Sequence, residues 1–386
     1  MIQTRFACAA VAVMLLCLPL VPRGATADVY AVEGLQVDVT AETAARARAK
    51  ALAQGEAAAF RQLLERLTLS EDHEYLPVLK RSEIAPYLLD FSVADEKTSA
   101  VRYLASLTYR FDRDRVRMLL TDQGLLFAET PSKPLLVLPV IEGTARSAEG
   151  GTAAATDSPM QLWDDPNPWR DAWGRLPGDR GLVPVLLPDG DLDDIAALSA
   201  EQAVDGDIAR LAAIGERYGA GAVLVVYGVL RGGEADGGDA ARLEVYVTRY
   251  GAVEPSDTQT LDFAETGEEG VDGLLLRAAS AIAATVEDDW KRNNVVQSGA
   301  PSILAVNVPI QTLADWIRLR DALGRVAIVR KVDMVLLSRA NVRVNLRYQG
   351  QPDQLTVALE QADLSLYPEG DQWLLVPRGT ARADDS

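Results

Sequence analysis

The sequence has little of the side-chain chemistry that most enzymes and small secreted proteins use. It contains two cysteines, Cys8 and Cys17, and a single histidine, His73. Both cysteines lie in the first 27 residues, which carry the pattern of a segment that is removed on export. The remaining chain therefore has no thiol that could form a disulfide, act as a nucleophile or bind a metal. These absences exclude cysteine catalysis and leave no ligand set for zinc.

A Ser-His-Asp triad would have to use His73, and the surroundings of this residue argue against that role. His73 lies in a short charged run, residues 70–74, and no Gly-x-Ser-x-Gly motif occurs in the chain. We interpret it as a solvated loop residue.

The N-terminal segment predicts export. Arg5 supplies a positive charge, residues 6–21 form a short apolar stretch, and Ala25 and Ala27 give the small-x-small cleavage motif. We expect cleavage between Ala27 and Asp28, and hence a periplasmic protein. An uncleaved membrane anchor is the alternative, but the apolar stretch is short for a span.

Charge narrows the class of partner. The 386 residues carry a formal net charge of −18, and loss of Arg5 and Arg23 with the signal peptide makes it −20. Such a surface repels nucleic acid and anionic lipid, so we expect an envelope protein or a glycan as partner, and no nucleic acid. No later segment has the roughly 18 uninterrupted apolar residues of a span, so we expect no transmembrane segment after cleavage.

Three units are predicted after the signal peptide (residues 1–27), with an α+β and α/β fold class. Residues 28–129 form an α+β unit, residues 130–297 a central α/β domain with a mixed sheet, and residues 298–386 a C-terminal βαββαβ domain with a polar tail. The central domain is predicted from continuous apolar runs, which suit strands buried on both faces. These runs are residues 134–143, 182–187 and 223–230.

The N-terminal unit is predicted to begin like a ferredoxin-like fold. An alternating strand at residues 30–40 precedes an Ala-rich helix that runs to about residue 67, and strands follow at residues 91–96 and 102–111. Asp112 is expected to cap the next helix. Small residues let the first helix lie close on the sheet. Its positions near helical spacing are Ala44, Ala47, Ala51, Ala58, Leu63 and Leu67.

The C-terminal domain is predicted to be a ferredoxin-like sandwich of order β-α-β-β-α-β. Thr312 is expected to cap its first helix. The expected strands are residues 303–308, 326–337, 342–348 and a final hairpin of 364–367 with 373–376, and the expected helices are residues 313–323 and 352–361.

Several blocks in the first two units resemble a bacterial envelope family. They occur in order between residues 29 and 229, as Ala-Arg-Ala-Lys-Ala-Leu-Ala-Gln, Leu-Leu-Glu-Arg-Leu-Thr, Leu-Thr-Tyr-Arg-Phe-Asp-Arg-Asp-Arg-Val-Arg-Met-Leu-Leu and Pro-Leu-Leu-Val-Leu-Pro-Val. The family is catalogued as domain of unknown function number 2066. The resemblance implies an exported bacterial protein, and it implies no activity and no catalytic residue. The element order of the central domain also resembles the α/β domains of periplasmic assembly factors.

Three tryptophans are the candidates for partner binding: Trp163, Trp169 and Trp173. Asn167 as N-cap with Pro168 after it predicts a short helix, on which Trp169 and Trp173 share a face. Stacking on a glycan or on a partner chain is the functional interpretation. We prefer packing against the sheet, because buried aromatic rings dominate core energetics.

An acidic turn at residues 189–194 is the candidate for calcium. The calcium-loop pattern needs glycine at its sixth position and glutamate at its twelfth, where this chain has Asp194 and Ala200. We therefore interpret the acids as favouring a helix N-terminus. The glycines at residues 219–221 precede a strand, whereas a phosphate loop follows one. No metal and no cofactor are predicted.

The sequence favours a non-enzymatic accessory or scaffold protein that binds an envelope partner. One alternative is a glycan-processing enzyme that uses two facing carboxylates, since the chain has many acids. Another is a small-ligand binding protein, which a closed apolar pocket would reveal.

Overall fold

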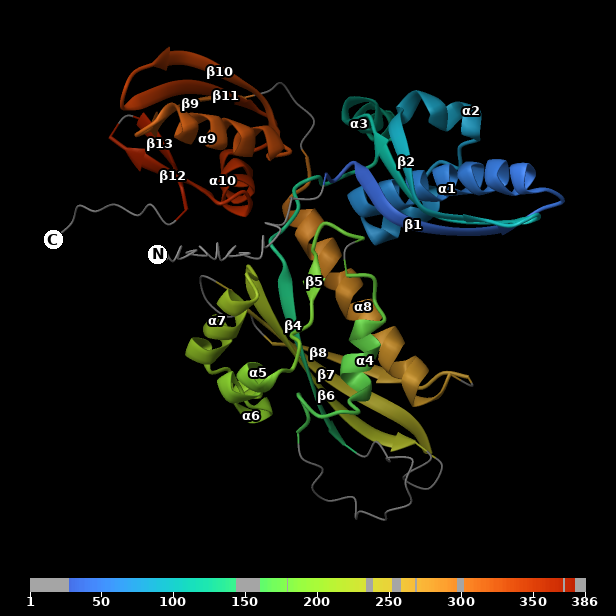
Figure 1. Ribbon diagram of the computed structural model, residues 1–386. Coiled ribbons are helices and arrows are strands. Elements are labelled where there is room, and N and C mark those ends of the chain that lie inside the picture. The colour runs from blue at the N-terminus through green and yellow to red at the C-terminus, as the bar shows by residue number, and fades with distance from the viewer. Residues whose placement is uncertain are drawn as a thin grey trace, which may run out of the picture.

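The computed structural model contains three units, each built around its own sheet (Figure 1). The sheet has three strands in the N-terminal unit and five strands in each of the central and C-terminal units. This mixture of open sheets and helices is the predicted α+β and α/β class. The structure describes residues 28–143, 160–178, 180–233, 239–251, 258–267, 269–296, 302–370 and 372–378.

The N-terminal unit is an antiparallel sheet of order β1-β3-β2 with α1 packed on one face. Asp112 caps α3, as predicted, because its carboxylate accepts hydrogen bonds from the amides of Asp114 and Arg115. The elements are β1 (Ala31–Thr40), α1 (Ala44–Leu67), η1 (Ser70–Tyr75), α2 (Arg81–Ile84), η2 (Ala85–Tyr87), β2 (Leu88–Thr98), β3 (Arg102–Phe111) and α3 (Arg113–Asp122).

The helix α1 lies close on the sheet because small residues face β3. A Cβ atom added to Gly55 would lie 2.7 Å from Leu107 Cδ1 and 3.0 Å from the Tyr109 hydroxyl, so a larger residue does not fit. The prediction of a close approach is thus confirmed, but Ala58 is wrong as a contact position, since it is exposed. Ala59 is buried instead, because it lies one turn after Gly55.

The central unit is a mixed sheet of order β5-β4-β6-β7-β8, in which β4, β5 and β6 are parallel. The helices α4 and α8 cover one face, and α5, α6 and α7 cover the other (Figure 1). Residues of β4 alternate between these two cores, so this strand is buried on both faces, as predicted. The elements are β4 (Leu135–Gly143), α4 (Pro168–Gly174), β5 (Val185–Leu186), α5 (Leu192–Ala197), α6 (Ala200–Val204), α7 (Ile208–Arg217), β6 (Ala222–Gly233), β7 (Asp239–Tyr250), β8 (Gln259–Ala264) and α8 (Gly270–Asn293).

One strand of the central sheet is shorter than its sequence predicts. The apolar run at residues 182–187 contributes only the two residues of β5. The amides of Leu182 and Val183 donate to the Glu287 carboxylate of α8, at 2.7 and 2.9 Å, instead of to a neighbouring strand. Pro184 has no amide hydrogen to continue a ladder.

The C-terminal unit has the sheet order β10-β11-β9-β13-β12, with α9 and α10 on one face. The predicted final hairpin forms, but β13 inserts between β9 and β12, which gives β-α-β-β-α-β-β instead of β-α-β-β-α-β. The apolar run at residues 373–376 suits this inner position, whereas β12 carries Pro368 and lies at the edge. The elements are β9 (Ser302–Pro309), α9 (Leu313–Arg325), β10 (Val329–Leu337), β11 (Asn341–Tyr348), α10 (Pro352–Gln361), β12 (Leu364–Glu369) and β13 (Gln372–Pro377).

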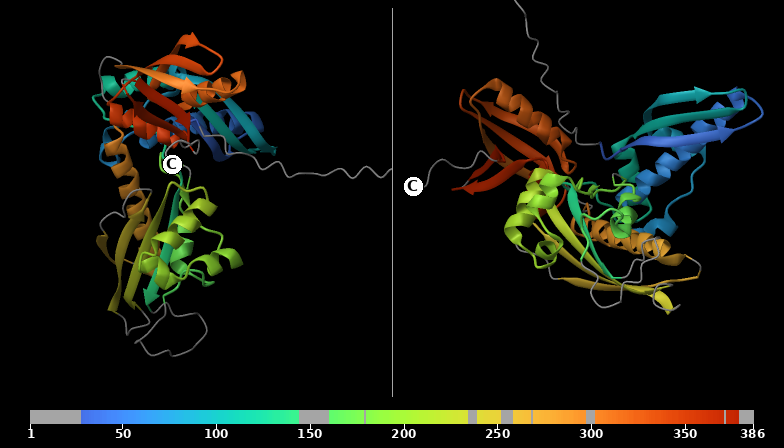
Figure 2. Two further views of the ribbon diagram at one scale, coloured as in Figure 1. Left: turned by 90° about the vertical axis from the view of Figure 1, so that its left-hand side faces the viewer. Right: turned by 60° about the horizontal axis from the view of Figure 1, so that its bottom comes forward.

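The first and last units both lie at one end of the central unit (Figures 1 and 2). The helix α8 runs toward this end, so its last turns lie where the three units meet. No helix in the described part of the chain is long and apolar enough to cross a membrane. The expected cleavage motif at Ala25 and Ala27 and the polar tail lie outside the described residues.

Candidate functional site: a buried charged junction

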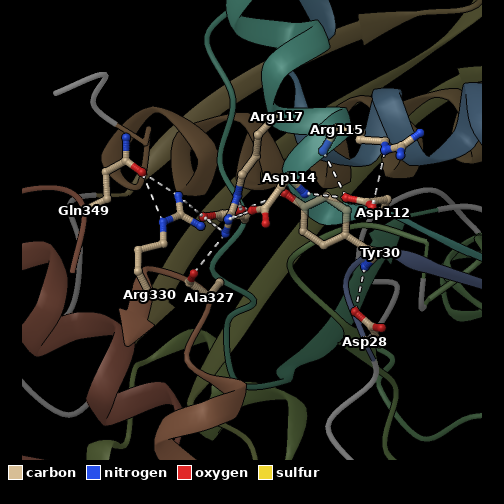
Figure 3. A network of polar contacts seen from close by, with 10 residues as sticks. Asp28, Tyr30, Asp112, Asp114, Arg115, Arg117, Ala327, Arg330 and Gln349 are labelled. Carbon is tan, nitrogen blue, oxygen red and sulfur yellow. Dashed lines mark hydrogen bonds and ion pairs between the residues drawn. The ribbon is translucent and has the colours of Figure 1, made fainter. Parts of the chain in front are cut away.

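Buried ionisable side chains gather where the N-terminal and C-terminal units meet. Glu129, in the segment between α3 and β4, is 0% exposed, and Arg117 of α3 is 8% exposed. Tyr30 and Arg330 converge on them from the start of the first unit and from β10 (Figure 3). We call these four residues the Glu129 junction.

Glu129 is held by three side chains. Arg117 binds it through two parallel hydrogen bonds of 2.7 Å, from Nε to Oε2 and from Nη2 to Oε1. The Tyr30 hydroxyl donates to Oε2 at 2.7 Å, and Arg330 Nη2 lies 3.5 Å from Oε1. The planar fork of an arginine matches both oxygens of a carboxylate, so this contact fixes orientation as well as charge.

The junction continues into the C-terminal unit. Arg117 Nη2 donates to the carbonyl of Ala327 at 3.1 Å, across 210 residues of sequence, and Arg330 Nη2 donates to Gln349 Oε1 at 2.6 Å. Arg117 Nη1 also donates to Asp114 at 3.0 Å, but the Asp114 side chain is 89% exposed. Two arginines thus depend on one buried carboxylate, and its removal leaves positive charge without compensation.

The pKa values at the junction suit a structural tie. Burial raises the pKa of the Tyr30 hydroxyl well above 10.0, and the charge of Glu129 raises it further. Burial lowers the pKa of Arg117, but the charge and hydrogen bonds of Glu129, together with Tyr30 and Asp114, outweigh this effect and the net pKa is raised. Near neutral pH the tyrosine stays neutral and the arginine stays charged. Neither has the pKa near the working pH that efficient acid–base catalysis uses.

A second set of buried charges, the Lys291 joint, connects the central and N-terminal units. Lys291, in the last turn of α8, is 3% exposed, and its Nζ donates to the carbonyls of Glu65 and Thr68 at 3.0 and 2.7 Å. These acceptors belong to the C-terminal end of α1, which carries a partial negative charge. Asp288 accepts a hydrogen bond from the Ser70 amide at 3.0 Å. Burial lowers the pKa of Lys291, against the raising effect of nearby acids.

Backbone contacts surround these two charged sets. Trp290 of α8 donates to the Thr130 carbonyl at 2.7 Å, and Gln354 of α10 donates to the Val295 carbonyl at 2.9 Å. Ala128 forms an isolated bridge with Val295. The end of α8 and the segment around Glu129 therefore bind all three units to one another.

The candidate tryptophans lie in the central unit. Trp169 and Trp173 are 0% and 2% exposed, and their rings meet edge to face at 5.9 Å. Asn167 caps α4, as predicted, and Trp169 Nε1 donates to the Val226 carbonyl at 3.1 Å. Trp163 is half-buried and donates to the Leu198 carbonyl at 2.7 Å. The burial of Trp169 and Trp173 is that expected for packing.

The other sequence candidates take structural positions. Asp191 caps α5 through the amides of Asp193 and Asp194, so the acidic turn begins a helix, as predicted. His73 is not a loop residue: it lies half-buried in η1, and its Nε2 is 3.1 Å from the carbonyl of Glu65. Within the described ranges, no group of three or more His, Cys, Asp or Glu residues is placed to hold a metal ion.

Two features of the described residues bear on the alternative functions, a carboxylate-based enzyme and a small-ligand binding protein. Each buried carboxylate is bound by hydrogen-bond donors of a neighbouring element. Glycoside hydrolysis instead needs two acids that face each other. The four buried carboxylates are Glu56 with Arg81, Glu129 with Arg117, Asp194 with Tyr218 and Asp288 with Ser70. A surface hollow of about 290 Å³ beside α1 is lined by Ala45, Arg48, Ala49, Leu52 and Arg81, and so it is not a closed apolar pocket.

Comparisons with known proteins do not identify the chain, because no family model and no curated protein matches it.

The Glu129 junction was not predicted from the sequence. One signal existed, since Glu129 is the only charged residue in the run 125–130. Its partners Arg117 and Arg330 lie among other surface arginines in the sequence, where nothing distinguishes them.

Proposed function

We propose that this protein is an exported, non-enzymatic scaffold or accessory protein of the bacterial envelope, which holds three small units in one arrangement for an envelope partner. The observation that carries the proposal is that buried charged side chains connect the units to one another. At the Glu129 junction and the Lys291 joint, these charges bind groups of different units together. Interfaces between domains otherwise allow relative motion, so buried ties suit a protein that presents several surfaces at once.

The location is part of the proposal. The pattern of residues 1–27 and the resemblance to an envelope family support export to the periplasm. Protein recovered from the envelope fraction should begin at Asp28 when its N-terminus is sequenced. An intact Met1 terminus in a cytoplasmic pool would contradict the location.

Affinity capture from envelope extracts tests the scaffold role, with the mature protein as bait. Glu129→Gln keeps the size of the side chain and removes the charge that orients Arg117 and Arg330. Asp114→Asn is the matched control, because it removes the exposed partner of the same arginine. We expect Glu129→Gln to retain three folded units and to lose captured partners, while Asp114→Asn captures as the wild type does.

Two results would overturn the proposal. Capture that is unaffected by the loss of the junction would mean that the arrangement of the units is not what the partner recognises. Turnover of cell-wall glycan by the purified protein would instead support the enzyme alternative.

A further inference from the structure

Exposed apolar side chains gather on one rim of the C-terminal unit. Six of the eighteen large apolar side chains that are exposed in the described chain lie there, with exposed fractions between 42% and 59%. A patch of this kind marks an interaction site, whereas single exposed apolar residues are ordinary. We call it the β10 rim; its residues are Leu313 and Ile317 of α9 and Met334, Val335, Leu336 and Leu337 of β10.

The rim includes the open edge of a sheet. The order β10-β11-β9-β13-β12 leaves β10 with no described strand on its outer side, so its outward amides and carbonyls are unpaired by the sheet. Figure 1 shows β10 on the side of this unit away from the central unit. Edge strands usually carry charges or proline that prevent pairing, and residues 334–337 carry neither. A bulge between Met334 and Leu336 is the one protective device on this stretch.

One face of the rim is apolar. The register places Met334 and Leu337 opposite buried valines of β11, so both side chains point to the face that the helices cover. Leu313 and Ile317 lie four residues apart on α9, the helix that packs beside β10. The apolar face of β10 is therefore the face that this helix shares.

The opposite face is basic. Lys331, Arg343 and Arg347 lie on it by register, and Asp333 is the acid among them. Residues 302–348 contain eight basic and three acidic side chains, although the whole chain has a net charge of −18. This local excess of positive charge is complementary to an acidic partner.

We propose that the β10 rim binds an extended segment of a partner protein, which pairs with β10 as an added strand and alternates apolar with acidic side chains. A strand directs successive side chains to opposite faces, so the apolar ones lie beside Met334 and Leu337 and the acidic ones meet Lys331, Arg343 and Arg347. The inference rests on the proposed scaffold role, whose partner it describes by chemistry.

Two other occupants suit the rim less well. A second copy that paired through the same edge would bring two sets of Lys331, Arg343 and Arg347 together, and like charges opposite each other are destabilising. An anionic membrane has no backbone groups that could pair with the open edge of β10. Both remain outcomes of the test.

Fluorescence anisotropy of the mature protein with labelled synthetic peptides tests the proposal. The probe alternates valine and glutamate over about ten residues, the length of a long strand. A peptide with lysine in place of glutamate tests charge, and a scrambled valine–glutamate peptide tests alternation. We expect saturable binding of the alternating acidic probe and at least about tenfold weaker binding of the other two.

Variants locate the site. The pair Met334→Ser and Leu337→Ser changes the apolar face, and Arg343→Glu changes the basic face; each should weaken binding by about tenfold or more. The control is Leu192→Ser with Ile195→Ser, two exposed apolar positions of α5, which should leave binding unchanged.

Equal binding of the acidic and basic probes, or unchanged binding by the rim variants, overturns the proposal. So does a dimer in sedimentation that the rim variants abolish, which would assign the rim to a second copy. Rim-dependent flotation with phosphatidylglycerol vesicles would assign it to a membrane instead.

The outcome is separable from that of the scaffold test. Glu129→Gln should bind the probe normally, because the rim lies wholly within the C-terminal unit. Envelope capture that survives the rim variants removes the rim proposal and leaves the scaffold standing. Probe binding without any envelope capture would remove the scaffold proposal and leave the binding site on the rim standing.

Discussion

The first and last units share a layout and differ at one edge. Both run β-α-β-β-α, and both place the second strand at the edge of the sheet, in the orders β1-β3-β2 and β9-β11-β10. The edge strand β2 carries Asp90, Asp95, Glu96 and Lys97, and Asp95 has a positive φ of 52°. The edge strand β10 instead ends in four exposed apolar residues.

This difference is not required by the fold, because the same topology accommodates both edges. Charge and irregular register make β2 a poor template for another strand. The apolar edge of β10 has a cost, since such edges invite aggregation. Its presence in one of two similar units fits the binding role that we propose for the β10 rim.

The largest expected effect comes from loss of the Glu129 junction, which binds the first and last units together. Glu129→Ala leaves Arg117 and Arg330 without their buried carboxylate and should lower the free energy of unfolding by about 3–5 kcal/mol. Urea unfolding of this variant should then show the units unfolding in separate transitions. Asp114→Ala removes only the exposed partner of Arg117, and a loss below about 1 kcal/mol is expected. Equal losses in the two variants would contradict the account of the junction.

The central unit provides a reference with an effect of similar size. Trp169→Ala should cost about 3–5 kcal/mol, because the side chain is fully buried. Trp169→Phe should cost more than Trp173→Phe, because Trp169 Nε1 donates to Val226 while Trp173 Nε1 has no hydrogen-bond partner among the described residues. Thermal melts check the order. Unchanged melts with lost envelope capture would assign these tryptophans to the partner instead.

Local sequence signals predicted most elements, because their causes are local. Asn167, Asp112 and Thr312 cap the helices that they were expected to cap, and the apolar run of β4 is buried on both faces. The errors have distant causes. Glu287, about a hundred residues away, binds the amides that shorten β5.

The partners of Glu129 could not be predicted for the same reason. Arg117 resembles its neighbouring arginines in sequence, and only the folded chain brings it to Glu129 and to the carbonyl of Ala327. The exposed residues of β10 were predicted as part of a strand, but their exposure depends on which strand becomes the edge.

A smaller effect should have opposite signs in the two similar units. Gly55→Ala places a Cβ 2.7 Å from Leu107 in the N-terminal unit and should destabilise it by about 1–3 kcal/mol. Gly324 of α9 has open space around it, so Gly324→Ala should stabilise the C-terminal unit by up to about 1 kcal/mol, from helix propensity. Urea unfolding measures both. Unchanged or raised stability of Gly55→Ala would show that α1 does not need its close approach.

The smallest expected effect is on the stability of the protein at low pH. Hydrogen bonds from the Thr312 amide and from Arg318 lower the pKa of Asp315 from 3.8 to about 2. Because the folded pKa is depressed, its stabilisation is complete above about pH 3.8 and is lost as the pH falls through about 2. Asp315→Asn should flatten the fall of stability over this range, as measured by urea unfolding. Asp321→Asn, on the same helix, is the control, and an equal flattening there would contradict the assignment.

The most direct test of the central claim measures the arrangement of the units themselves. The chain has no cysteine after residue 27, so Lys97→Cys in β2 and Gln311→Cys before α9 allow spin labels to be placed on the two similar units. Pulsed electron paramagnetic resonance then gives the distribution of distances between them. The account predicts one narrow distance, which Glu129→Ala broadens and Asp114→Ala does not. A broad distribution with the junction intact would contradict the claim that buried charges hold the units in place.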